Sequence, residues 1–132
     1  MTDIRWQESF LNLGKALNRL GEILEQPLDE RDYVLDAAIQ RFEFTVDLFW
    51  KALKHLLALE GAITRLPKEA LQKAYAANWI ENEKIWLEML EDRNITSHTY
   101  KHDRAMEVYD NIQKYYPEMR KVYNLLEKKF YF

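Results

Sequence analysis

Hydrophobic side chains recur at intervals of three, four and seven positions along most of this 132-residue chain, with polar side chains between them. Such intervals place the hydrophobic residues on one face of an α-helix, and no stretch of strand length alternates between hydrophobic and polar residues. The spacing predicts four long helices and one short helix that begins at Pro67, over residues 2–25, 32–60, 67–78, 79–94 and 103–130. The sequence therefore predicts an all-α fold, an antiparallel up-down four-helix bundle with additional short helices, in one domain over residues 1–132.

Residues 32–60 carry the clearest pattern, because two neighbouring rows of hydrophobic residues repeat every seven positions. The rows are Leu35, Phe42, Phe49 and Leu56, and Ile39, Val46 and Leu53. A seven-residue repeat is typical of the left-handed seam between helices in a bundle. Helix-breaking residues agree with these boundaries: Pro27 ends the first helix, Gly61 is a natural stop for the second, and Pro117 is expected to break or kink the last.

Composition narrows the class of protein. Hydrophobic residues make up 48% of the chain and aromatic residues 14%, which favours a folded core over disorder. The chain has no cysteine, which excludes disulfides, thiolate metal sites and a cysteine nucleophile. A net charge of −3 is not the strongly basic footprint of most nucleic-acid-binding proteins, so a phosphate site must come from a local cluster. No apolar run is long enough for a membrane span and the N-terminus lacks a signal-peptide core, so we expect a cytoplasmic protein without membrane contact.

The segment between the last two predicted helices carries the candidate chemistry. Arg93, His98 and Tyr100 put a fixed cation, an imidazole and a phenol within eight residues. A guanidinium clamps phosphate groups, an imidazole moves protons near neutral pH, and a phenol positions or accepts a group. This combination points to phosphodiester or nucleotide chemistry, with Asn94 as a possible supporting residue.

One straight helix cannot aim all three side chains at one phosphate. Each residue turns a helix by about 100°, so Tyr100 aligns with Arg93 while His98 lies roughly 140° away. The polar residues from Asn94 to Ser97 favour caps and turns, and a break there would bring the groups together. A second copy of the chain at a symmetric interface would also complete the geometry. The plain alternative is that the segment is only a linker between helices.

Two other groups of polar residues have both a structural and a chemical interpretation. Glu43 and Asp47 lie one turn apart on the predicted second helix, either as an exposed ionic stripe or as acids that face Arg93 and orient it. His98 and His102 have a spacing that would chelate a metal on a helix. No glutamate stands where a metallohydrolase helix would use one, and a turn would separate the two rings. We therefore expect neither a metal site nor a cofactor.

The spacing Arg93-x4-His98-x-Tyr100 resembles the R-x4-H-x-Y signature of the HEPN family. Its context, residues 92–100 (DRNITSHTY), is similar to the bacterial branch of nucleotidyltransferase substrate-binding proteins, which is related to HepT toxins. A second stretch, residues 40–54 (QRFEFTVDLFWKALK), looks like the second-helix pattern of that branch. The resemblance covers nearly the whole chain, and the two stretches together are more specific than the short signature.

The resemblance implies an up-down helical bundle that is commonly a homodimer, with the signature near a shared cleft. It also implies a separate small nucleotidyltransferase as partner, in a toxin–antitoxin type of pair in which the bundle protein cuts RNA and the nucleotidyltransferase silences it. Carried over to this chain, the nuclease residues are Arg93 and His98, and Tyr100 is the acceptor for AMP. The expected partners are that nucleotidyltransferase, a second copy of this chain and RNA, but not DNA.

Three functions remain open at this point. The first is a HepT-like, metal-independent ribonuclease. The second is a non-catalytic subunit in which Arg93 and His98 hold a phosphate or nucleotide for a nucleotidyltransferase. The chain has no acidic metal-binding cluster and no glycine-rich phosphate loop, so nucleotidyl transfer itself is not expected of it. The third is a dimeric scaffold in which the motif is only a helix junction.

Overall fold

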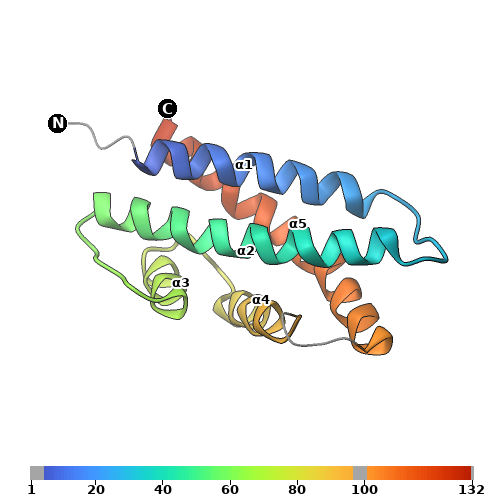
Figure 1. Ribbon diagram of the computed structural model, residues 1–132. Helices are drawn as coiled ribbons and strands as arrows, with labels where there is room; N and C mark the ends of the chain where they lie inside the picture. The colour runs from blue at the N-terminus through green and yellow to red at the C-terminus, as the bar shows by residue number, and fades with distance from the viewer. Residues whose placement is uncertain (1–4, 97–100, 132) are drawn as a thin grey trace.

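The computed structural model describes residues 5–96 and 101–131, and every regular element within those residues is an α-helix. The helices are α1 (Arg5–Leu24), α2 (Tyr33–Leu59), α3 (Pro67–Ala76), α4 (Glu83–Thr96) and α5 (His102–Tyr131). Figure 1 shows α1 and α2 side by side and antiparallel, with α5 crossing behind them and α3 and α4 along the other side of α2. The predicted all-α bundle of four long helices with an additional short one is confirmed.

The helix α2 is the centre of the bundle, since it packs against each of the other four helices. Both predicted hydrophobic rows face inward, and only Ile39 among their members is partly exposed. The core also contains three of the tryptophans, Trp6, Trp79 and Trp86, which are 9%, 4% and 3% exposed. Burial of such residues is the main favourable term in folding, so the seven-residue repeat identifies the helix around which the chain packs.

Glycine ends α2 in the way the sequence predicts. Gly61 has a φ of 87°, in the left-handed region that a glycine adopts without strain. Its N–H donates to the carbonyl of Ala58, and the N–H of Ala62 donates to the carbonyl of Leu57. These two bonds form a Schellman motif, which satisfies carbonyl groups that the helix itself leaves open.

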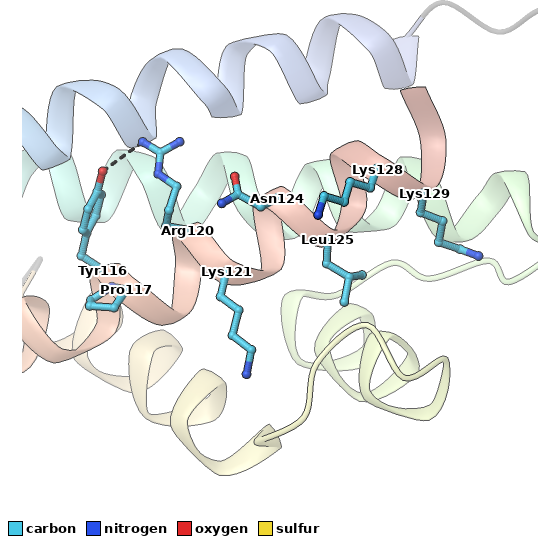
Figure 2. Close-up of a pocket in the computed structure, with 8 residues that line it drawn as sticks. All are labelled: Tyr116, Pro117, Arg120, Lys121, Asn124, Leu125, Lys128 and Lys129. Carbon is cyan, nitrogen blue, oxygen red and sulfur yellow. Dashed lines mark hydrogen bonds between the residues drawn. The ribbon is translucent and has the colours of Figure 1, made fainter. Parts of the chain in front are cut away.

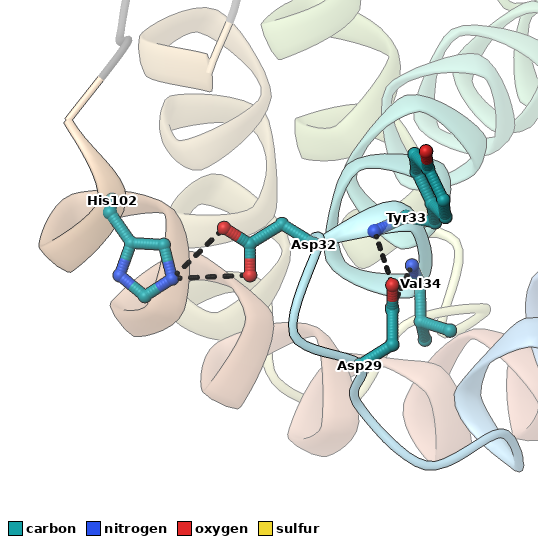
Figure 3. A network of polar contacts seen from close by, with 5 residues as sticks. All are labelled: Asp29, Asp32, Tyr33, Val34 and His102. Atoms are coloured by element: carbon teal, nitrogen blue, oxygen red, sulfur yellow. Dashed lines mark hydrogen bonds and ion pairs between the residues drawn. The ribbon is translucent and has the colours of Figure 1, made fainter.

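The start of α2 depends on a residue outside the helix. Asp29 accepts hydrogen bonds from the backbone N–H groups of Tyr33 (3.1 Å) and Val34 (2.8 Å), and so caps the first turn. Asp32, at the formal cap position, has a φ of 59° and makes no side-chain cap bond. Figure 3 shows its carboxylate turned toward His102 at the start of α5, with 3.3 Å between the imidazole Nε2 and the carboxylate.

The predicted start of the fourth helix at Trp79 is wrong. Asn78 adopts a φ of 64° and ends α3 in a second Schellman motif, in which the N–H of Trp79 donates to the carbonyl of Ala74. The chain then runs through buried loop residues before Asn82 caps α4 by accepting from the N–H of Ile85. The hydrophobicity of residues 79 and 80 reflects burial in a loop, which periodicity alone cannot distinguish from burial in a helix.

The last helix does not end at its proline. The helical assignment of α5 continues through Pro117, so the predicted break does not occur, and the alternative of a kink stays a prediction. The Pro117 ring lies on the exposed side of the helix. Packing of the residues around it, such as Tyr115 and Met119 at 4% and 0% exposed, outweighs the loss of one backbone hydrogen bond.

Candidate functional site

The end of α4 carries Arg93, whose guanidinium is held by a carboxylate of α2. Its Nε donates to Asp47 Oδ1 at 2.9 Å and its Nη2 donates to Asp47 Oδ2 at 3.0 Å. The two side chains are 24% and 36% exposed, so the pair lies at the surface but is partly shielded from water. A planar guanidinium and a carboxylate bound through two parallel bonds have one relative orientation, which fixes the direction of the cation.

Charge at this site favours the protonated guanidinium. The hydrogen bonds to Asp47, together with the negative charges of Asp47 and Glu43, raise the pKa of Arg93 above its ordinary value. Of the two interpretations of this acidic pair, the structure supports the one in which it faces Arg93. Asp47 bonds to the guanidinium, and Glu43 contributes through its charge.

The helix α4 runs further than the sequence predicts. Asn94 lies within it and is exposed, and the helix continues to Thr96, so the expectation that the break already includes Asn94 is wrong. His98 and Tyr100 lie outside the described residues. The structure therefore gives the position of the motif's cation only.

A buried carboxylate precedes Arg93 by one residue. Asp92 is 8% exposed, and its Oδ2 accepts from the hydroxyl of Tyr115 at 2.6 Å and from Nδ2 of Asn111 at 3.0 Å. Burial, the hydrogen bond to Asp92 and the nearby acidic charges raise the pKa of Tyr115 above its ordinary value, so the phenol remains a donor. Sequence reasoning missed Asp92. Its spacing could have identified it, because Asp92 follows Met89 by three residues and Ile85 by seven, which places it on the inward side of α4.

One groove follows the outer face of α5 and is not at the motif (Figure 2). Pro117 and Leu125 line it among several cationic side chains. Those cations diverge: Arg120 donates to Asn18 of α1 at 2.8 Å, whereas Lys121 bonds to Glu81 at 2.9 Å on the other side. Because the charges point apart, this face does not converge on one small anion.

The structure offers no metal cluster within residues 5–96 and 101–131, where no group of three or more His, Asp or Glu side chains is arranged to hold an ion. His102 pairs with Asp32, and the suggested pairing of His98 with His102 lies partly outside the described residues. None of the described helices has the length and apolar character needed to cross a membrane.

Comparisons with known proteins agree on one family. A family model described as nucleotidyltransferase substrate binding protein like matches residues 8–128. A curated Haemophilus influenzae protein, named probable ribonuclease HepT, is 34% identical over 95 residues, which are 68% of this chain. The match spans 65% of the length of that relative.

Solved structures extend the similarity to the fold. A crystal structure of a Thermus thermophilus protein superposes with a TM-score of 0.80 at 34% identity, covering 86% of this chain and 98% of the other. A Haemophilus influenzae structure, described as the fold of a substrate binding domain of a nucleotidyltransferase, has a TM-score of 0.68 at 28% identity. That match covers 92% of this chain and 96% of the other. Each match covers nearly all of the solved chain, so the whole arrangement of helices is similar in the three proteins.

Proposed function

The chain belongs to the nucleotidyltransferase substrate-binding protein family, and from this membership we propose that it is the HepT-like partner of a separate small nucleotidyltransferase and a metal-independent ribonuclease. The observation that carries the proposal is the fork between Arg93 and Asp47, which holds a cation at the end of α4 in a defined direction. Similarity to a probable ribonuclease supports the same activity.

Cleavage proceeds by internal attack in this proposal. The 2′-oxygen of the substrate attacks the adjacent phosphorus and the 5′-oxygen leaves, which restricts the reaction to RNA and forms a 2′,3′-cyclic phosphate. His98 takes the proton from the 2′-hydroxyl, and His98 of a second copy gives a proton to the leaving oxygen. Imidazole suits both roles because it titrates near neutral pH.

Arg93 binds the phosphate and stabilises the negative charge that develops on it. A guanidinium that Asp47 already orients loses less conformational freedom when the phosphate arrives than a freely rotating side chain would. Asp47 and Glu43 therefore act as supporting residues, and exposed Asn94 is a further contact for the substrate.

Tyr100 orients the phosphate or His98, and it is also the acceptor for regulation by the partner. In that step the phenolic oxygen attacks the α-phosphorus of ATP, pyrophosphate leaves, and the phenolic proton passes to solvent or a base of the partner. AMP on Tyr100 adds bulk and negative charge beside Arg93 and so competes with RNA for the cation.

Two copies of the chain form the active species in this proposal. The exposed face of α2 near the site carries Phe44, which is 60% exposed, and Tyr33, which is 65% exposed. They are eleven residues apart, about three helical turns, and so lie on one face. Large exposed aromatic residues are enriched at protein interfaces. A Phe44→Lys substitution is expected to give a monomer in light scattering while the circular dichroism spectrum of the helices is retained.

The test is cleavage of RNA by the purified chain in the presence of a chelator. Wild-type protein is expected to give products with a 2′,3′-cyclic phosphate, and His98→Ala is expected to abolish them. His55→Ala is the matched control, because His55 lies on α2 about 12 Å along the helix axis from Asp47. Cleavage that survives His98→Ala, or that disappears equally in both variants, contradicts the mechanism.

A second candidate is a non-catalytic subunit that holds a substrate for the nucleotidyltransferase. The description of the matching Haemophilus influenzae structure as a substrate binding domain favours it. In this case Arg93 and His98 bind a nucleotide or phosphate without turnover. The isolated chain then binds nucleotide in an Arg93-dependent manner and leaves RNA intact, whereas the ribonuclease cleaves it alone.

A further inference from the structure

The end of α4 is attached to two different helices through two consecutive residues. Arg93 bonds to Asp47 of α2, and Asp92 accepts bonds from Tyr115 and Asn111 of α5. Consecutive residues point about 100° apart on a helix, so the two attachments pull in different directions. Together they restrict rotation of α4 about its own axis, which neither does alone.

The α5 side of this attachment is rigid. The ring of Tyr115 stacks on Phe42 of α2 with centroids 5.8 Å apart and planes at 21°, and Phe42 is fully buried. The hydroxyl of Tyr115 therefore has little freedom to move. Asn111 stands one turn earlier on α5 and bonds to the same carboxylate oxygen. Asp92 is thus held at one point by two donors from a packed surface.

A buried carboxylate is an expensive way to join two helices. Removing a charge from water costs free energy that even good hydrogen bonds only partly offset, and a hydrophobic residue of similar size is often at least as stable. What a hydrogen-bonded carboxylate adds is direction, since the 2.6 Å bond from Tyr115 is short and tolerates little displacement. Asp92 directly precedes Arg93 in the chain, so a fixed orientation of Asp92 also affects the orientation of Arg93.

We propose that Asp92 is a positioning residue, which acts with Tyr115 and Asn111 to set the orientation of Arg93 toward its phosphate. This inference rests on the proposed role of Arg93 as the phosphate-binding cation. A shift of about 1 Å in a group that contacts the reacting atoms lowers a reaction rate by roughly 100-fold. Loosening α4 at Asp92 is therefore expected to affect catalysis more than folding.

The central experiment compares Tyr115→Phe with Tyr116→Phe. The first removes the hydroxyl that bonds to Asp92, and the second removes a neighbouring hydroxyl on α5 that accepts from Arg120, away from the motif. We expect Tyr115→Phe to lower kcat for RNA cleavage by about tenfold or more, with a smaller change in KM, and Tyr116→Phe to leave both within about twofold. Equal effects of the two variants overturn the proposal.

Arg93 itself supplies a readout that does not depend on RNA. The Nε–H group of Arg93 bonds to Asp47, so its nitrogen–proton resonance and its exchange with water report the orientation of the guanidinium. Tyr115→Phe and Asp92→Asn are expected to shift this resonance and speed its exchange, whereas Tyr116→Phe leaves it unchanged. A purely structural role lowers the unfolding midpoint without moving the resonance, and that result overturns the proposal.

A double-mutant cycle separates this inference from the proposed function. In His98→Ala protein, binding of an RNA oligonucleotide is measured with Tyr115→Phe, with Arg93→Ala and with both. If Asp92 acts through Arg93, the effect of Tyr115→Phe vanishes once Arg93 is absent, and additive losses contradict it. If wild-type protein neither cleaves nor binds RNA, the proposed function fails, while the Arg93 resonance still decides whether Asp92 orients it.

Discussion

Two regions of the molecule join helices by different means. In the aromatic cluster, the start of α1 meets the end of α5 through Trp6, Phe10, Tyr123, Phe130 and Tyr131. In the polar junction, the end of α4 meets α2 and α5 through Arg93, Asp47, Asp92, Tyr115 and Asn111. Ring packing buries a large apolar area, whereas the polar bonds are modest in net energy and strict in geometry.

The difference separates stability from orientation. The aromatic cluster is expected to contribute most to the free energy of unfolding, because each ring removes a large surface from water. The polar junction is expected to contribute less to that free energy and more to activity, because it determines where Arg93 points. The predictions below test this separation, from the largest effect on stability to the smallest.

The largest effect is expected from Phe10→Ala. Phe10 is 2% exposed and stacks on Tyr123 with centroids 4.4 Å apart, so its removal leaves a cavity. The free energy of unfolding should fall by about 3–5 kcal/mol, as measured by urea denaturation. Leu11→Ala is the matched control, because Leu11 is 57% exposed and its removal should change stability by about 0.5 kcal/mol at most. RNA cleavage by the folded fraction of Phe10→Ala should be retained. A selective loss of cleavage would mean that the aromatic cluster also determines activity.

Gly14→Ala is the second test of the aromatic cluster. A Cβ at this position would lie 2.5 Å from the hydroxyl oxygen of Tyr123, whose ring is held by the stack on Phe10. The resulting overpacking should cost about 1–3 kcal/mol in urea denaturation, partly offset by the better helix propensity of alanine. Adding Tyr123→Phe removes the hydroxyl and should recover part of the lost free energy of unfolding. No recovery in the double variant would mean that the strain lies elsewhere.

Asp47→Asn tests the polar junction itself. The pair with Arg93 is partly exposed, so losing its charge should lower the free energy of unfolding by about 1 kcal/mol or less, with a smaller effect at high salt. RNA cleavage should fall by about tenfold, because Arg93 loses its orienting partner. Asp36→Asn, an exposed acid on the same helix, is the control and should leave cleavage unchanged. If Asp47→Asn lost as much stability as Phe10→Ala and still cleaved RNA, the polar junction would contribute to stability and not to activity, which contradicts the prediction.

The smallest effect concerns the pH dependence of the α2 cap. Hydrogen bonds from the backbone N–H groups of Val34 and Tyr33 hold the pKa of Asp29 below its ordinary value. A carboxyl whose folded pKa is lowered stabilises the protein above its unfolded pKa, and this contribution is lost as the pH falls through the folded pKa. The urea midpoint of wild type should therefore exceed that of Asp29→Asn at neutral pH, and the two should converge as the pH falls through the folded pKa of Asp29. Glu30→Gln, at the neighbouring exposed acid, is the control, and a constant gap between wild type and Asp29→Asn would refute the charge-based cap.

Prediction from the sequence succeeded where the signal is local. The two rows on α2, the stop at Gly61 and the start of α3 at Pro67 were all identified, because periodicity and helix-ending residues act within a few positions. It failed at Trp79, where burial in a loop resembles burial in a helix, and in the helix break expected at Pro117, where packing holds α5 together across a proline. Arg93 was identified as a candidate from its chemistry and its family resemblance.

The helices, the inward faces and the candidate cation follow from residue order alone, since each depends on neighbours within one or two turns. The partners of the polar junction do not. Asp47 is 46 residues from Arg93, and Tyr115 and Asn111 are 23 and 19 residues from Asp92. Whether two such groups meet depends on how each helix is rotated about its axis when the bundle packs, and many rotations bury similar apolar area. The packed helices select one of them, and with it the direction of Arg93 and the burial of Asp92.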